Sequence, residues 1–348
     1  MKVYKNVFEE IISLENLFAA WDTFKSNKQK KRDVQAFEWN LEHNIFELHR
    51  ALKSGRYRHG SYTSFFIQDP KQRHIHKALV QDRILHHALF TVLNPIFEST
   101  FIAHSFSCRV NKGTHKGIEV LEGMIRKITH NGVHMAFALK CDVQKFFGSV
   151  DHQTLKSILA RKIKDVQALD LCSKIIDSFA TNPLGGGRYR RGLPIGNLTS
   201  QLFANIYLNE FDQFIKHDLK VKNYVRYTDD FVIVHQSEEE LKNLLPKIRE
   251  FLSTRLKLTL HPRKVILNKT SQGVDFLGYV LLLHHRALRT KTRRRIVRKF
   301  KLRMGEYRKG VITRQTLEQS LQSYLGVLSH ADNYVISEGL KNMLWFWK

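Results

Sequence analysis

The chain has 348 residues, and its 57 Lys and Arg against 32 Asp and Glu give a formal net charge of +25. Hydrophobic residues make up 43%, which excludes global disorder, and 18 Gly and 6 Pro exclude collagen-like or low-complexity chains. The sequence contains no run of roughly 18 apolar residues, the length that a membrane-spanning helix needs. Three scattered cysteines argue against a disulfide framework or a cysteine zinc site. We therefore expect a multidomain globular protein in a reducing, cytoplasmic compartment.

The basic residues are clustered. The strongest cluster, from Arg289 to Arg303, has nine cations in 15 residues, and no acid follows before Glu306. Apolar residues such as Ile296 and Phe300 are interleaved at helical spacing, so one face could pack on a core while the other meets phosphates. Nucleic acid is the favoured partner. A solvated helix face and an acidic membrane surface are the alternatives.

The spacing of apolar residues predicts the elements in chain order. It predicts helices over 5–22, 33–53, 75–97 and 114–130, and a strand over 61–68 before a turn at Asp69-Pro70. Further along, it predicts buried strands at 135–141, 224–225 and 231–234, helices over 198–214 and 238–256, a strand-rich stretch over 274–283 and helices from about 290. The glycines at 185–187 predict a flexible hairpin tip.

Three acidic residues stand at the ends of predicted strands. Asp142 follows one apolar run, and Asp229 and Asp230 interrupt another. Adjacent acids within a strand-like run predict a tight hairpin whose tip presents carboxylates, and an exposed turn is the alternative. Carboxylate oxygens are the ligands that Mg²⁺ prefers, and two such ions can clamp the attacking and leaving oxygens of a phosphoryl transfer.

These acids lie in segments that resemble the motifs of one family. Tyr227–Asp230 (YTDD) resembles the YxDD motif of reverse transcriptases. Four other segments resemble further motifs of that family and keep its chain order: a fingers motif at 105–118, the first palm motif of the group II intron type at 141–152, a template-binding motif at 193–208 and a primer grip at 276–279.

The resemblance implies an α+β right-hand polymerase with a small antiparallel palm sheet and a helical thumb. The implied parts are an N-terminal helical extension (1–59), fingers (60–131, completed by 152–190), palm (132–151 and 191–285) and a basic thumb (286–348). It also implies an RNA-directed DNA polymerase that extends a primer on template RNA with dNTPs and two Mg²⁺ ions, for which Mn²⁺ could substitute.

The resemblance further assigns roles to residues. Asp142, Asp229 and Asp230, with the carbonyl of Val143, would hold the metal ions. Lys264 would protonate the departing pyrophosphate, or would be a surface lysine that neutralises phosphate. Contacts to the dNTP would come from Lys71, Arg73, Phe147, Gly196 and Gln201. Contacts to template or primer would come from Arg109, Ile195, Tyr227, Phe276, Leu277, Gly278, Tyr279, Arg294 and Arg298.

The two adjacent phenylalanines of the first palm motif are expected to differ in role. Phe147 is expected to be a steric gate against the 2′-hydroxyl of a ribonucleotide, and Phe146 to pack in the core.

The template-binding motif departs from that of group II intron enzymes. It reads Ile195-Gly196-Asn197-Leu198-Thr199-Ser200-Gln201 in place of Gln-Gly-x-x-x-Ser-Pro. This form resembles the enzymes of diversity-generating retroelements, which copy a template RNA with errors at adenines and usually work with a small basic accessory protein. The length of 348 residues, without room for the endonuclease domains of many intron proteins, fits the same expectation.

Other functions stay open. A retron-like or defence-associated reverse transcriptase shares most of the motifs. A non-catalytic RNA-binding protein and a basic structural protein are more remote, because the three acids are intact and the motifs keep their order.

Overall fold

The computed structural model describes residues 2–69, 71–181 and 190–345. The predicted glycine hairpin tip at 185–187 and the predicted turn residue Pro70 lie outside the described residues. The chain forms two compact units, each assembled from several segments. Unit 1 comprises Met1–Cys108, Asp142–Lys220 and Pro246–Pro262, and unit 2 comprises Arg109–Cys141, Val221–Leu245 and Arg263–Lys348. These units divide the chain differently from the expected fingers, palm and thumb, whose boundaries stay a prediction.

Unit 1 is mainly helical, with one two-stranded hairpin. Its elements are α1 (Val7–Ile12), α2 (Leu14–Lys25), α3 (Arg32–Trp39), α4 (Leu41–Lys53), β1 (Thr63–Ile67), β2 (Arg73–Lys77), α5 (Val80–Glu98), α7 (Phe146–Ser149), α8 (His152–Lys162), α9 (Val166–Asp177), α10 (Leu198–Gln213) and the π-helical turn η1 (Phe214–Asp218). Helix α11 (Glu238–Arg255) begins in unit 2 and ends in unit 1.

Helix α5 is at the centre of unit 1. It packs against α1, α2 and α10. It buries Ile84, Leu85, Ala88, Leu89 and Leu93 completely, at spacings that place them toward these neighbours. Among the described residues, no helix is both long and apolar enough to cross a membrane.

Two of the long helices predicted near the N-terminus are each broken. The predicted helix over 5–22 is α1 and α2, because Ser13 adopts an extended ψ of 142° and its side chain accepts a hydrogen bond from Asn16 N at 3.2 Å. The predicted helix over 33–53 is α3 and α4, which are separated at Asn40 (φ −121°, ψ 43°). At Ser13 a capping side chain thus overrides a continuous apolar pattern, whereas at Asn40 the break is one of backbone conformation without a side-chain cap.

The predicted helix over 75–97 is wrong at its start. Residues 73–77 form β2, which pairs antiparallel with β1 so that Ile67 faces Arg73 and Phe65 faces Ile75. The helix begins only at Val80, and it continues past Pro95 to Glu98. The strand at 61–68 is confirmed as β1. Because side chains alternate across a strand, Arg73 and Ile75 share one face of the hairpin, and His74 and His76 share the other.

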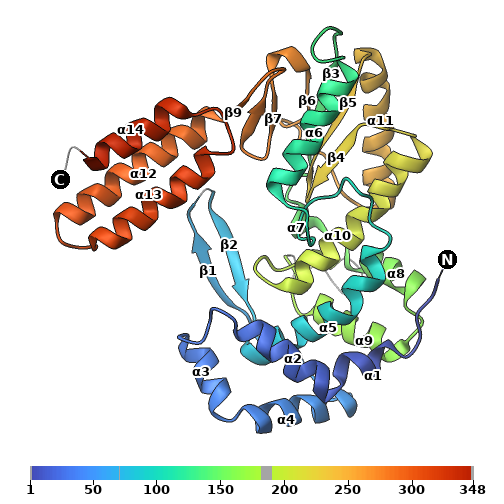
Figure 1. Cartoon of the computed structure of the whole chain (residues 1–348). Helices are drawn as coiled ribbons and strands as arrows, with labels where there is room; N and C mark the ends of the chain where they lie inside the picture. The colour runs from blue at the N-terminus through green and yellow to red at the C-terminus, as the bar shows by residue number, and fades with distance from the viewer. Residues whose placement is uncertain (1, 70, 182–189, 346–348) are drawn as a thin grey trace. The chain divides into compact units, whose positions relative to one another are not determined.

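Unit 2 contains a four-stranded sheet, a three-stranded sheet and a helical C-terminal part (Figure 1). Its elements are α6 (Thr114–Ile128), β3 (Phe137–Asp142), β4 (Tyr224–Tyr227), β5 (Asp230–His235), β6 (Ile266–Lys269), the 3-10 turn η2 (Thr270–Gln272), β7 (Val274–Phe276), β8 (Tyr279–Leu281), β9 (Arg286–Leu288), α12 (Thr290–Arg308), α13 (Arg314–Leu328) and α14 (Tyr334–Trp345). Asp142, the last residue of β3, is grouped with unit 1.

The four-stranded sheet has the order β4-β5-β3-β6, and α6 packs against β4 and β5. Residues 231–234 of β5 are at most 1% exposed, so this strand is covered on both faces. Burial on both faces explains why the sequence there is continuously apolar rather than alternating.

The three-stranded sheet has the order β7-β8-β9, and α13 packs against both α12 and α14 (Figure 1). Arg286 links β9 to helix α6 and to the segment between α13 and α14. Its guanidinium donates two hydrogen bonds to Glu122 of α6, at 2.8 and 2.6 Å, and one to the carbonyl of His330 at 3.1 Å. This bidentate pairing raises the pKa of Arg286 above its usual value.

Candidate active site

The turn between β4 and β5 presents two adjacent carboxylates. Residues 228–229 form the turn, and Asp230 is the first residue of β5. Thr228 has φ 53°, in the left-handed region that tight hairpin turns use. Arg226, which is 1% exposed, donates from Nη1 to the carbonyl of Thr228 at 3.0 Å. This hydrogen bond stabilises the turn. The predicted hairpin with acids at its tip is confirmed.

The third predicted acid ends a strand of the same sheet. Asp142 is the last residue of β3, which is the neighbour of β5 in the strand order. The chain continues in extended form, since the carbonyl of Asp142 accepts from His261 N at 2.8 Å and Val143 bridges to Leu260. Val143 is itself 1% exposed.

A lysine lies beside Asp230. Lys140 Nζ is 3.6 Å from Asp230 Oδ2 and 3.6 Å from Asp275 Oδ1. Asp275 in turn accepts a hydrogen bond from Arg289. Four charges of alternating sign therefore connect β5, β3, β7 and the N-cap of α12.

The donor type at these strand ends fits a magnesium ion, because hard carboxylate oxygens are its preferred protein ligands. All three acids are partly accessible rather than sealed in the core. Within the described part of the chain, no three Asp, Glu, His or Cys side chains are close enough to form a ready-made metal site.

Part of the predicted nucleotide site is assembled in unit 1. His76 N donates to the carbonyl of Ile195 at 2.9 Å, and Asn197 Nδ2 donates to the carbonyl of His76 at 2.8 Å. Gly196 has φ 111°, and a Cβ added to it would lie 2.7 Å from Ile75 Cγ2. The hairpin face that carries Arg73 is therefore the face that meets Gly196.

The remaining predicted nucleotide contacts are in the same unit. Arg73 and Lys71 are both exposed, Arg73 on β2 and Lys71 in the turn before it. Gln201 is exposed in the first turns of α10. Phe146 is 2% exposed, as expected for a core residue, while Phe147 is partly exposed with its ring edge-on to Phe146 at 5.4 Å between centroids. The role of Phe147 as a gate stays a prediction.

The predicted primer grip forms the turn between β7 and β8. Leu277 and Gly278 take positive φ values of 51° and 93°, which a two-residue hairpin turn requires. Phe276 and Tyr279 pair across the turn and are both buried. Burial raises the pKa of the Tyr279 phenol above its usual value.

Other predicted contacts are dispersed. Tyr227 ends β4, and its hydroxyl accepts from Thr114 Oγ1 of α6 at 3.5 Å. Arg109 lies before α6, and Lys264 lies in the segment before β6; both are partly exposed.

A basic groove runs along α12. It has a volume of about 790 Å³ and is lined by residues of α12 together with Ile336 of α14. Arg294 and Arg298, both exposed, are among its lining residues, with Arg293 and Lys301 beside them. The predicted amphipathic basic helix is confirmed, since Ile296 and Phe300 are buried on its other face.

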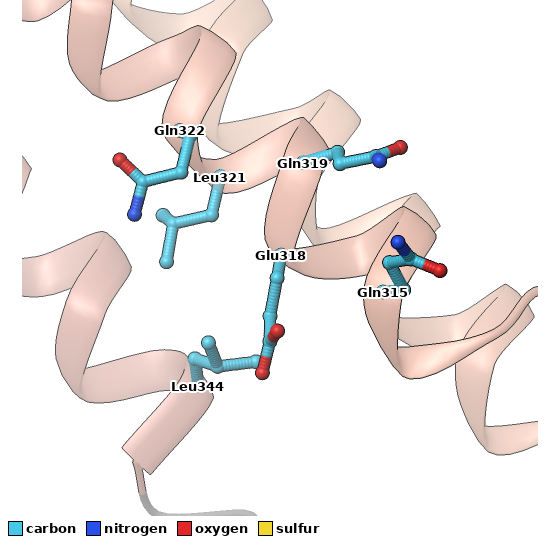
Figure 2. Close-up of a pocket in the computed structure, with 6 residues that line it drawn as sticks. All are labelled: Gln315, Glu318, Gln319, Leu321, Gln322 and Leu344. Carbon is cyan, nitrogen blue, oxygen red and sulfur yellow. The ribbon is translucent and has the colours of Figure 1, made fainter.

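A second hollow of about 570 Å³ lies between α13 and α14 and has a different character (Figure 2). Its lining consists of three glutamines, two leucines and one acid: Gln315, Gln319, Gln322, Leu321, Leu344 and Glu318. Glu318 is paired with Arg314 at 2.9 Å. This hollow lacks the cations that phosphate binding needs.

Sequence reasoning overlooked two cations of the candidate site, Arg226 and Lys140. Each interrupts a strand that is otherwise apolar, in VRY and ALKC. A charged residue inside a buried strand is costly unless it is paired, so this interruption was the available signal.

Comparison with known proteins gives a consistent family. Residues 68–281 match the family described as reverse transcriptase (RNA-dependent DNA polymerase). The chain is 26% identical over 251 residues to protein YkfC of Escherichia coli, an alignment that covers 62% of each chain. It is 23% identical over 347 residues to the group II intron-encoded protein LtrA of Lactococcus lactis, covering 80% of this chain and 57% of LtrA. The chain thus spans about three fifths of the length of these relatives.

Among solved structures, a similar one is apo telomerase from Candida tropicalis. It has a TM-score of 0.46 and 13% sequence identity, and the match covers 65% of this chain and 48% of the telomerase chain.

Proposed function

Because the chain belongs to the reverse transcriptase family, we propose that it is an RNA-directed DNA polymerase that copies a template RNA into cDNA. The observation that carries this proposal is the pair of acids at the β4–β5 turn, on a strand adjacent to the one that Asp142 ends. The sheet and its acids all fall within the matched residues 68–281.

In the proposed reaction, Asp142, Asp229 and Asp230 hold the divalent ions, with the carbonyl of Val143 as a further ligand. Bound Mg²⁺ supplies Lewis-acid activation of the primer 3′-hydroxyl and neutralises charge at the α-phosphate. The hairpin face with Arg73 orients the triphosphate through the fork geometry of its guanidinium, with Lys71 in support. Phe147 and Gly196 define the space for the sugar and the new base pair, and Lys264 gives a proton to the departing pyrophosphate.

Template and primer are held by the remaining predicted residues. The β7–β8 turn supports the primer end, and Arg294 and Arg298 of the α12 groove contact the backbone of the duplex. Non-specific phosphate contacts of this kind position the nucleic acid without reading its sequence.

We further propose that the enzyme is the adenine-mutagenic polymerase of a diversity-generating retroelement. Support comes from the segment Ile195–Gln201, which departs from the group II intron form of the template-binding motif. The proposal includes a small basic accessory protein and a cytoplasmic location. A retron-like or defence-associated reverse transcriptase is the second candidate, since neither relative named above is described as an enzyme of a diversity-generating retroelement.

The test is primer extension on an RNA template with dNTPs and Mg²⁺, followed by sequencing of the product. The matched variants are Asp229→Ala and Asp170→Ala, the second a paired acid on the surface of α9. We expect extension by the wild type and Asp170→Ala, and a loss of at least about 10³-fold in Asp229→Ala, because removing a metal ligand removes most of the charge stabilisation.

The sequenced product decides the finer proposal. Errors concentrated opposite template adenines support the diversity-generating assignment. Faithful copying would keep the polymerase and favour a retron-like or defence role. No extension, even with the genomically linked RNA and accessory protein added, would leave a non-catalytic RNA-binding protein.

A further inference from the structure

Lys140 is an unusual residue for its position. It lies in β3, two residues before Asp142, so the two side chains share a face of the strand. Its flanking residues Leu139 and Cys141 are at most 1% exposed, and the Lys140 side chain itself is only 14% exposed. An ammonium held this far from water is costly unless it is paired, and an apolar residue would be the cheaper choice for packing alone.

The pairing of Lys140 joins two functional segments. Its Nζ is equidistant, at 3.6 Å, from Asp230 of the acidic turn and Asp275 of the strand that leads into the primer-grip turn. Arg289, the N-cap residue of the basic helix α12, is the second cation paired with the carboxylate of Asp275. The backbone N–H of Arg289 also donates to the carbonyl of Gly278 in the primer-grip turn, at 3.0 Å.

This geometry points to a role for Lys140 beyond packing. We propose that Lys140 is a positioning residue that holds Asp230 and Asp275 in register and, through its charge, weakens the binding of a divalent cation at Asp230. The proposal rests on the proposed function, which makes Asp230 a metal ligand. A fixed positive charge within 4 Å of a carboxylate opposes the approach of a second cation, and partial burial reduces the screening by water.

Replacing Lys140 and replacing its partner Asp275 should change the affinity for Mn²⁺ in opposite directions. Replacement of Lys140 by Gln removes the competing charge, so Mn²⁺ should bind roughly three- to thirtyfold more tightly. Asp275→Asn removes a negative charge, so that of the two carboxylates only Asp230 still pairs with Lys140. Mn²⁺ should therefore bind more weakly to this variant. Lys140→Arg keeps the charge and should restore wild-type affinity.

The experiment measures Mn²⁺ binding to the full chain, without primer, template or dNTP, from the loss of the free-ion electron paramagnetic resonance signal. The specific site is identified with Asp230→Asn, and the gain from Lys140→Gln should vanish in the Lys140→Gln/Asp230→Asn double variant. Lys269→Gln, at an exposed position of the neighbouring strand β6, removes the same charge and should leave the affinity unchanged. Circular dichroism and urea unfolding establish that each variant is folded.

Several outcomes would overturn the proposal. Unchanged affinity in Lys140→Gln, or the same gain in the presence and absence of the Asp230 carboxylate, would make Lys140 a merely structural residue. If Lys140→Gln fails to fold, Asp275→Asn decides, because unchanged or tighter binding in that variant contradicts the model of shared charge. The polymerase proposal is judged separately: primer extension by the wild type tests it, and a negative result there leaves the binding data interpretable.

Primer extension supplies the second readout. Because Lys140 positions Asp230 rather than touching the nucleotide, Lys140→Gln should lower kcat while the KM for dNTP stays within about twofold. Lys140→Arg should recover most of kcat. A raised KM with unchanged kcat would place Lys140 in nucleotide binding and contradict the assigned role.

Discussion

Phe146 and Phe147 are adjacent in sequence and differ in surroundings. Phe146 is 2% exposed and belongs to the core of unit 1, whereas the Phe147 ring is partly exposed. The carbonyl of Phe147 accepts from Leu193 N at 2.6 Å, and this bond fixes the backbone that carries the ring. An anchored backbone limits how far the ring can retreat from an extra hydroxyl, because the ring can then move only by rotation about its own side-chain bonds.

Replacing Phe147 by Ala should therefore increase the incorporation of ribonucleotides relative to deoxyribonucleotides. A steric barrier of about 1–3 kcal/mol corresponds to a change of roughly 10–200-fold in the ratio of kcat/KM values. The measurement is single-nucleotide extension with rATP against dATP. Phe146→Ala is the matched control, expected to cost about 3–5 kcal/mol of folding stability with the nucleotide preference preserved. An unchanged preference in Phe147→Ala would show that the gate is another residue.

The hairpin β1–β2 and the segment before α10 depend on each other. The hydrogen bonds between His76, Ile195 and Asn197 attach β2 along this segment. Gly196 is the contact point, since its φ of 111° and the 2.7 Å approach of Ile75 Cγ2 to an added Cβ both disfavour any larger residue.

Gly196→Ala should consequently lower both stability and activity. The backbone conformation alone costs about 1–2 kcal/mol for a residue with a Cβ, and the contact with Ile75 adds to it. The free energy of unfolding should fall by at least this amount in urea, and kcat/KM for dNTP should fall with it. Adding Ile75→Ala to the Gly196→Ala variant should recover the part of the stability loss that is due to the contact. The part due to the backbone conformation should remain. Full recovery would mean that the positive φ carries no cost, contrary to expectation.

The same elements show how far the sequence predicts the fold. The buried strands β3, β4 and β5 and the basic helix α12 follow from apolar runs and helical spacing, because their surroundings are uniform along the element. Strand β2 does not, since RHIHK is half exposed and becomes a strand only through its pairing with β1. The break at Ser13 depends on one side-chain hydrogen bond, which competes with an unbroken apolar pattern.

The candidate site also has one part that the sequence predicts and one part that it does not. The acidic turn could be predicted, because two adjacent carboxylates within an apolar run are too costly to bury and must reach the surface at a turn. The partners of Lys140 could not, since Asp230 lies 90 positions and Asp275 lies 135 positions further along the chain. Asp230 comes close because β5 is the neighbour of β3, whereas Asp275 is on β7 of the other sheet and approaches only through the packing of the fold. Pairwise distances between strands are set by register, which a single sequence does not reveal.

The cations behind the net charge of +25 differ in their surroundings. Some cations are paired with carboxylates on their own helix, such as Arg314 with Glu318 on α13 and Lys341 with Glu338 on α14. Others line the α12 groove, such as the exposed Arg294 and Arg298. The net charge counts both kinds of cation equally. A cation that displaces counterions from a phosphate contributes to binding, however, whereas a cation already paired with a carboxylate contributes little.

The salt dependence of binding to an RNA/DNA primer-template separates the two kinds. The wild type should lose about 10³–10⁵ in affinity between 50 and 200 mM salt if it makes roughly 6–10 phosphate contacts. Arg294→Gln/Arg298→Gln should reduce the slope of log K against log salt by about 2, one for each lost contact. Arg314→Gln/Lys341→Gln lowers the net charge equally, from +25 to +23, and should leave the slope near the wild-type value. Equal slopes in the two double variants would mean that long-range charge, rather than the α12 groove, carries the electrostatic part of binding.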